Sequence, residues 1–239
     1  MTNPFSLSIK LYMDGAELDT MKRLRDEQAV QGFTTNPTLM RKAGISDYEG
    51  FARAAIAALP DMPISFEVFS DDFDSMEREA RKIASWGGDT YIKIPIMNTQ
   101  SESAIPLIRK LSAEGFSLNV TALLTLDQVR DVAKAIDPKA RTIVSVFAGR
   151  IADSGRDPVP AMREAAEILE SIPSAELLWA STREAINLVQ AQEAGCHIIT
   201  VPPDILAKTS NFGRDLDEYS LDTVKMFYRD ACAAGFRIA

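Results

Sequence analysis

Short apolar runs alternate with amphipathic stretches from one end of the chain to the other. The apolar runs are mostly continuous, a pattern typical of strands in a parallel sheet whose outer side is covered by helices. The stretches between them place apolar residues at helical spacing, for example Leu18, Met21 and Leu24. The predicted strands span residues 9–13, 32–35, 64–69, 91–96, 117–123, 142–147, 177–180 and 197–201. A helix is predicted after each strand.

These strand–helix units follow one another without a linker or a low-complexity segment. They predict α/β architecture, with a single (β/α)8 barrel, or TIM barrel, over residues 1–239. A doubly wound open sheet has the same alternation and is the alternative. The chain contains 46% hydrophobic residues, which is sufficient for one large core.

One extra C-terminal helix, predicted over residues 221–234, has no strand after it. It either covers the barrel of its own chain or packs on a neighbouring subunit, and we favour the second arrangement. Its apolar stripe at helical spacing consists of Leu221, Val224, Phe227, Tyr228 and Ala231.

The charge of the chain limits the kinds of partner expected for it, and its cysteines indicate the cellular compartment. The chain carries 34 acidic against 26 basic residues, a net charge of −8, and shows no basic stripe of the kind that binds nucleic acid. Nucleic acid is therefore not expected as a partner. Cys196 and Cys232 lie far apart and form no Cys-x-x-Cys motif, so a reduced, cytoplasmic protein is expected. We expect neither a signal peptide nor a membrane span.

Polar residues follow most of the predicted strands at the point where each strand ends. Functional residues of TIM barrels lie at this end, so these side chains are the candidates for chemistry. They are Asp14, Thr34, Asn36, Glu67, Lys93, Asn119, Thr121, Ser145, Arg150, Ser181 and Arg183. They include no evident set of metal ligands, so neither a metal nor another cofactor is predicted.

Lys93 is the most informative of these residues. It lies between Ile92 and Ile94, and because side chains alternate along a strand, isoleucines that face the helices direct Lys93 into the barrel. Burial disfavours the charged ammonium form, and the neutral amine is the form that attacks a carbonyl. The alternative is a structural lysine paired with a carboxylate.

Two carboxyl groups and two arginines complete the candidate chemistry. Glu67, in a mostly apolar strand, and Asp14 suit proton transfer, although either could serve only to neutralise Lys93. Arg150 and Arg183, which follow successive strands, suit binding of a phosphate together with a hydroxyl group. A helix beginning near Arg183 would add backbone donors. The alternative for the arginines is a pair of surface salt bridges.

Two motifs resemble those of the transaldolase family. The segment Thr34–Thr35–Asn36–Pro37–Thr38 resembles the family motif Thr-Thr-Asn-Pro-Ser/Thr. The segment Tyr91–Ile92–Lys93–Ile94–Pro95 resembles the strand that carries the family's lysine. The short chain is similar to the small-subunit branch, which includes fructose-6-phosphate aldolase. Members of this branch often form large rings, so a homo-oligomer is expected.

The resemblance implies a role for each candidate. Lys93 would form an imine with the donor ketose, while Glu67, Thr121 and Asp14 would hold a catalytic water and move protons. The remaining residues would contact the substrate, a sugar phosphate. Asn36, Asn119 and Ser145 would bind the dihydroxyacetone hydroxyls, Arg150, Ser181 and Arg183 would bind the phosphate, and Thr34 and Phe147 would complete the pocket.

Two positions distinguish transfer from simple cleavage. The aldolase branch is similar but has Gln at the position of Glu67 and Tyr at that of Phe147, whereas this chain has the transaldolase residues. The resemblance therefore implies transfer of a dihydroxyacetone unit from fructose 6-phosphate or sedoheptulose 7-phosphate to an aldose phosphate. The alternatives are a fructose-6-phosphate aldolase-like lyase, a transaldolase of 6-deoxy-6-sulfofructose, and a non-catalytic barrel that binds sugar phosphates.

Overall fold

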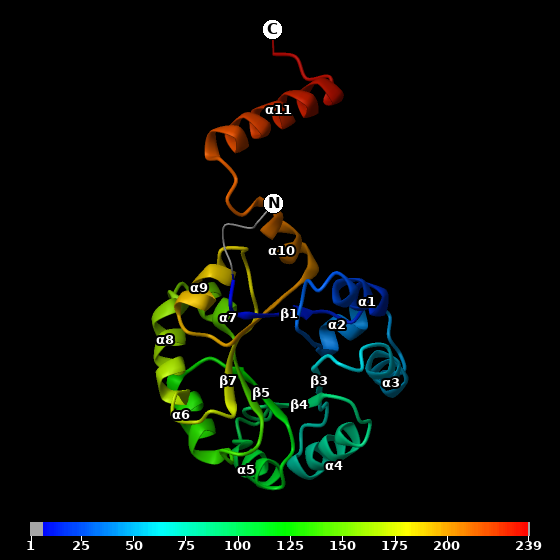
Figure 1. Cartoon of the computed structure of the whole chain (residues 1–239), viewed down its shortest axis with the longest axis vertical. Helices are drawn as coiled ribbons and strands as arrows, with labels where there is room; N and C mark the ends of the chain where they lie inside the picture. Colours follow the sequence, from blue (N-terminus) through cyan, green and yellow to red (C-terminus); the bar gives the residue numbers. More distant parts are fainter. Residues whose placement is uncertain (1–6, 239) are drawn as a thin grey trace. The chain divides into compact units, whose positions relative to one another are not determined.

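The computed structural model describes residues 7–238 and contains a closed barrel of eight parallel strands arranged in chain order (Figure 1). The predicted (β/α)8 fold is confirmed, and the open sheet is excluded because β1 pairs with both β2 and β8. The strands are β1 (Lys10–Asp14), β2 (Gly32–Thr34), β3 (Ile64–Glu67), β4 (Thr90–Pro95), β5 (Leu118–Leu123), β6 (Thr142–Val146), β7 (Ala175–Trp179) and β8 (Ile198–Val201).

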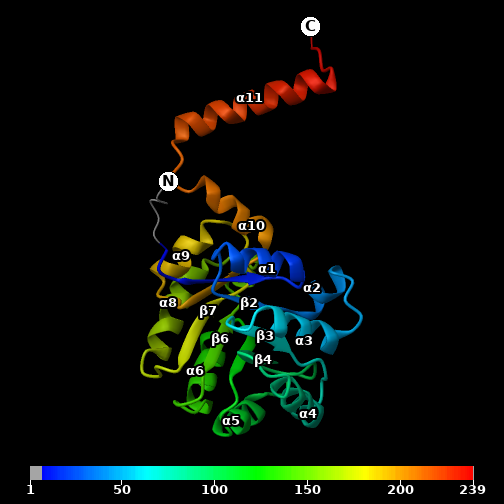
Figure 2. The ribbon, with the colours of Figure 1, turned by 45° about the vertical axis from the view of Figure 1, so that its right-hand side comes forward.

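Within residues 7–206, helices surround the strands, as Figure 2 shows from a second direction. Most of them follow a strand as predicted. The short helices α2 and α7 were not predicted and begin directly after β2 and β6. The helices are α1 (Leu18–Asp26), α2 (Pro37–Lys42), α3 (Tyr48–Ala58), α4 (Phe73–Ala84), α5 (Ile105–Ala113), α6 (Leu126–Ala135), α7 (Ala148–Asp153), α8 (Pro158–Leu169), α9 (Asn187–Glu193), α10 (Pro203–Lys208), η1 (Thr209–Asn211, a 3₁₀ turn) and α11 (Leu216–Ala234).

Aromatic and aliphatic side chains fill the interior of the barrel. Tyr12, Tyr91 and Ile143 belong to one buried cluster with Leu178 and Ala180. The last two also line a pocket at the carboxyl ends of the strands, so they form its floor. The interior is therefore a packed core, and open space begins only where the strands end.

The chain divides at residue 206 into a barrel unit, residues 7–206, and a C-terminal unit. Helix α11 of the C-terminal unit begins at Leu216 rather than at residue 221, because the Asp215 side chain accepts hydrogen bonds from the backbone N–H groups of Asp217 and Glu218. It ends at Gly235, which adopts a left-handed conformation. Among the helices within residues 7–238, none combines the length and hydropathy of a membrane span.

Candidate active site

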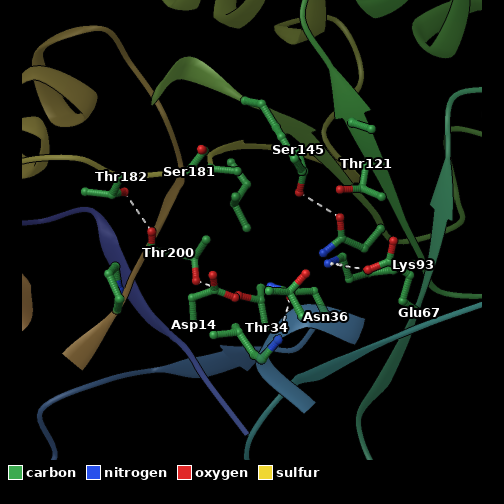
Figure 3. A pocket seen from close by; sticks show the side chains of 18 of the residues that line it. Asp14, Thr34, Asn36, Glu67, Lys93, Thr121, Ser145, Ser181, Thr182 and Thr200 are labelled. Carbon is green, nitrogen blue, oxygen red and sulfur yellow. Dashed lines mark hydrogen bonds and ion pairs between the residues drawn. The ribbon is translucent and has the colours of Figure 1, made fainter. Parts of the chain in front are cut away.

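A pocket of about 510 Å³ opens at the carboxyl ends of the strands. The structure brings all the predicted site residues together there, from strands and loops on every side of the barrel (Figure 3). They are Asp14, Thr34, Asn36, Glu67, Lys93, Asn119, Thr121, Ser145, Phe147, Arg150, Ser181 and Arg183.

Lys93 points into this pocket from β4 and is only 6% exposed. Its Nζ donates to the Thr35 carbonyl oxygen at 2.8 Å and lies 3.1 Å from Glu67 Oε2. Its neighbours Ile92 and Ile94 are buried, as the alternation of β4 requires. The amine therefore combines a low-dielectric environment with one carboxylate and one carbonyl acceptor, a setting that would suit a nucleophile in direct contact with a base.

A short chain of hydroxyl groups holds the Asp14 carboxyl. The Thr34 hydroxyl donates to Asp14 Oδ1 at 2.9 Å and is itself 2.6 Å from the Thr200 hydroxyl. Burial raises the pKa of Asp14, and the charge of Lys93 and the Thr34 hydrogen bond offset this effect only in part. A carboxyl group in this state can hold a proton closer to neutral pH than an ordinary aspartate.

Thr121 reaches the pocket from an irregular part of β5. The pairing of β5 with β6 shifts register between Val120 and Leu123, and Ala122 there has a φ of 64°. Such bulges redirect side chains at the ends of strands. The Thr121 hydroxyl is buried and has no hydrogen-bond partner within the described residues. It is therefore available to a water molecule or a substrate hydroxyl.

A buried chain of hydrogen bonds fixes Asn119. The Ser145 hydroxyl donates to Asn119 Oδ1 at 2.7 Å, and Asn119 Nδ2 donates to the Ser65 hydroxyl at 3.0 Å. Asn36 is fixed differently, because its Oδ1 accepts from Leu39 N at 3.0 Å and so caps α2. Both amides thus have defined orientations at the pocket wall.

The two arginines differ in their surroundings. Arg150 lies on α7 with its guanidinium carbon 5.4 Å from the centroid of the Phe147 ring. Within residues 7–238 no carboxylate lies within ion-pair distance of Arg150. Arg183 instead makes three hydrogen bonds to Asp153, the shortest 2.5 Å. The salt-bridge alternative therefore describes Arg183 but not Arg150.

The segment after β7 does not begin a helix at Arg183, which corrects that expectation. Helix α9 begins at Asn187, whose side-chain oxygen accepts from the backbone N–H groups of Arg183 and Glu184. Ser181 has a φ of 64°, which turns the chain away from helical geometry. Backbone donors of a helix N-terminus are consequently absent at Arg183.

Gly149, in the first turn of α7, is in backbone contact with Ser181, in the loop after β7. A Cβ atom added at Gly149 would lie 1.5 Å from the Ser181 carbonyl oxygen. Only glycine permits this approach. The contact fixes the part of the rim that carries Ser181 and Arg183.

Sequence analysis missed several residues of the site. Thr200 and Thr182 line the pocket, and the Thr182 hydroxyl donates to the Thr200 carbonyl oxygen at 2.7 Å. Lys42 also lines it from the end of α2. Thr200 could have been predicted as a pocket residue from its position on the last strand. The position of Lys42 depends on helix α2, which was not predicted. Residues 7–238 contain no group of three or more His, Cys, Asp or Glu side chains arranged to hold a metal ion.

Comparison with known proteins connects this geometry to a family. The family model described as Transaldolase/Fructose-6-phosphate aldolase matches residues 11–238. A Listeria monocytogenes protein described as Probable transaldolase 2 is 34% identical over 201 residues, covering 84% of this chain and 88% of that protein. A Dehalococcoides mccartyi protein described as Probable transaldolase is 32% identical over 199 residues, covering 83% and 88%.

Solved structures add evidence for the fold. The crystal structure of KGPDC from Streptococcus mutans superposes on this chain with a TM-score of 0.57, covering 83% of this chain and 90% of that one. The two sequences are 12% identical, so the likeness shows a shared barrel fold alone.

Proposed function

Since this chain belongs to the transaldolase/fructose-6-phosphate aldolase family, we propose that it is a transaldolase acting through a Schiff base on Lys93. It transfers a dihydroxyacetone unit from a ketose phosphate, fructose 6-phosphate or sedoheptulose 7-phosphate, to an aldose phosphate. The observation that carries the proposal is the buried Lys93 amine, 3.1 Å from Glu67 in a pocket that also contains Asp14.

Formation of the imine needs a nucleophile and a route for protons. The Lys93 amine attacks the keto carbon of the donor, and loss of water gives the imine. Glu67 relays the protons through a water molecule bound to the free Thr121 hydroxyl. Both groups lie on strands that adjoin β4, which supports this assignment.

Transfer needs a base for the carbon–carbon step. Asp14 takes the proton of the C4 hydroxyl while the C3–C4 bond breaks, which releases an aldehyde and leaves an enamine on Lys93. An acceptor aldehyde then adds to the enamine, and the same steps run in reverse. Asn36, Asn119 and Ser145 bind the hydroxyls of the three-carbon unit. The raised pKa of Asp14 supports its role, because the group must both accept and return a proton near neutral pH.

The anionic end of the sugar lies on the side of the pocket away from Lys93, at the arginines. Arg150, which has no ion-pair partner within the described residues, is the principal ligand, with Ser181 beside it. Arg183 joins them by exchanging or sharing its contact with Asp153. A guanidinium binds phosphate and sulfonate by the same charge-assisted hydrogen bonds, so a sulfosugar is the second substrate to test.

Borohydride trapping tests the proposal directly. Wild-type protein incubated with fructose 6-phosphate and borohydride should carry a reduced three-carbon adduct on Lys93, detected by peptide mass mapping. Added erythrose 4-phosphate should remove the adduct, because the acceptor consumes the enamine. Lys93→Met should give no adduct, whereas Lys42→Met, which removes another lysine of the same pocket, should still give one.

Each other outcome identifies an alternative. An adduct that is insensitive to acceptor aldehydes, with release of free dihydroxyacetone, indicates a lyase. An adduct formed only with 6-deoxy-6-sulfofructose indicates a sulfosugar transaldolase. Sugar phosphate binding that survives Lys93→Met, with no adduct from any ketose, would establish a non-catalytic barrel.

We also propose that the protein is a homo-oligomer in which α11 packs on a neighbouring copy. Leu221, Val224 and Phe227 share one side of this helix and are all more than half exposed in the single chain. Contiguous apolar side chains of this size are normally covered by protein. A second copy of the chain is the partner expected from the family resemblance.

A further inference from the structure

Tyr48, the first residue of α3, makes two hydrogen bonds to the backbone of Glu67. Its hydroxyl donates to the Glu67 carbonyl oxygen at 3.0 Å and accepts from the Glu67 N–H at 2.8 Å. Tyr48 does not line the pocket and carries none of the predicted roles. Its contact with the backbone of the residue that pairs with Lys93 nevertheless places it next to the reacting groups.

The register of β2 and β3 shows what this contact replaces. Phe33 N donates to Pro63 O, and Thr35 N donates to Ser65 O. In a parallel ladder the next bond in this series runs from Glu67 N to Thr35 O. In the structure, other bonds replace this one: Glu67 N donates to the Tyr48 hydroxyl, and Thr35 O accepts from Lys93 Nζ. The Tyr48 hydroxyl thus takes the place of the carbonyl of Thr35, the residue directly after β2.

We infer that Tyr48 is a positioning residue: it satisfies the Glu67 backbone and so leaves the Thr35 carbonyl free to orient the Lys93 amine. The inference rests on the proposed function and deepens it. The two acceptors Thr35 O and Glu67 Oε2 each take one N–H of Lys93 Nζ. The remaining position on Nζ is then directed toward the pocket, where the donor carbonyl binds.

Surrounding groups hold the Tyr48 ring in place. Its centroid lies 4.5 Å from that of Phe69, 5.6 Å from Trp86 and 6.2 Å from Phe66. Asp47 caps α3 by accepting from Gly50 N, which fixes the start of the helix. Burial raises the pKa of Tyr48, so its hydroxyl keeps the proton that it donates. A rigid, protonated phenol is therefore always present at the Glu67 backbone.

Removal of the hydroxyl should redirect one hydrogen bond. In Tyr48→Phe the ring packing is retained, but the buried Glu67 N–H needs another acceptor. The nearest one in the ladder is Thr35 O, the acceptor that Lys93 uses. Competition for this carbonyl should turn the amine and shift Glu67. A displacement of about 1 Å at such a site costs on the order of 100-fold in rate.

The test compares Tyr48→Phe with Tyr12→Phe, which removes the hydroxyl of a tyrosine in the barrel core that does not line the pocket. The first-order rate of imine formation, from borohydride quenching at increasing times, should fall roughly 100-fold in Tyr48→Phe, with KM changed much less. Tyr12→Phe should retain the wild-type rate. Equal rates in wild type and Tyr48→Phe would overturn the inference, as would a rate loss explained by a smaller folded fraction.

A second measurement tests the inference independently of the proposed function. It still gives an answer if no ketose forms an adduct with the wild-type protein, an outcome that would contradict the proposed function alone. Reductive methylation with formaldehyde and cyanoborohydride, followed by peptide mass mapping, reports the reactivity of the Lys93 amine at each pH. The pH profile of Tyr48→Phe should be displaced from that of wild type, while the Tyr12→Phe profile should coincide with it. Coincidence of all three profiles would refute a role for Tyr48 in orienting the amine.

Discussion

The buried carboxyl group of Asp14 lowers the stability of the folded protein, while the same burial suits it to the proton transfer proposed for it. Burial raises its pKa above the value of about 3.9 expected in the unfolded chain. Between these two values the folded protein binds more protons than the unfolded chain, so the free energy of unfolding decreases as pH rises through that window. The contribution runs opposite to that of a salt-bridged aspartate, whose pKa is lowered.

We predict that Asp14→Asn raises the free energy of unfolding at pH 7 by on the order of 1 kcal/mol. The gain should be smaller at pH 4, because lowering the pH protonates the wild-type carboxyl, whose pKa is raised by burial. The same change should lower kcat about 100-fold or more, because the base for carbon–carbon cleavage is lost. Urea unfolding at both pH values, with kinetics on the same samples, measures the two effects. A variant less stable than wild type at pH 7 would contradict the stability prediction.

In the proposed mechanism, Phe147 determines what happens to the enamine after the first aldehyde leaves. Its ring lies beside Arg150 at the pocket wall and offers no proton. We predict that Phe147→Tyr increases release of free dihydroxyacetone by about tenfold or more relative to transfer, because a phenol can protonate the enamine carbon. An enzymatic assay for dihydroxyacetone, with and without acceptor, gives the ratio. An unchanged ratio would remove Phe147 from the explanation of transfer.

At the scale of elements, the long amphipathic helices and the apolar strands were predictable, whereas the short helices α2 and α7 were not. Helices α2 and α7 span only Pro37–Lys42 and Ala148–Asp153, fewer than two full turns each. An apolar period of 3.6 residues cannot be recognised over so short a stretch. These two helices nevertheless place Asn36 and Arg150, so the sequence predicted which residues line the pocket better than which elements hold them.

The supporting residues escaped prediction for a related reason. Tyr48 acts through the backbone of Glu67, and Asp153 acts on Arg183 across 30 positions of sequence. Neither side chain lies at the end of a strand, the only position that the barrel pattern marks. Start points of helices also depend on caps, as Asp215 shows by starting α11 before residue 221.

At the scale of the whole molecule, the continuous apolar strands made the closed barrel predictable, because every strand is covered by helices outside and by side chains inside. The relation of the chain to its neighbours was not predictable in this way. An apolar stripe on a helix shows that something covers it, but not which surface does so.

Phe227 offers a test of the proposed assembly. It is 63% exposed in the single chain and lies within the apolar stripe of α11. We predict that Phe227→Glu lowers the molar mass in solution, because a charge in the contact between copies carries a large desolvation cost. Light scattering coupled to size exclusion measures the mass, and Arg229→Glu, on the same helix, is the matched control. A wild-type mass that equals the 26.2 kDa of one chain would rule out the assembly altogether.

The contact between Gly149 and the Ser181 carbonyl has a consequence for how this site can change. Because α7 and the loop after β7 meet backbone to backbone, no side chain can be inserted between them, and the rim that carries Arg150 and Arg183 cannot be widened by substitution at that point. The opposite rim, built by Thr38, Leu39 and Lys42 of α2, consists of side chains on one short helix. For the proposed transfer reaction, substitutions in α2 could therefore change which aldehydes fit the pocket, for example longer, branched or uncharged ones, while the rim that carries the arginines stays fixed.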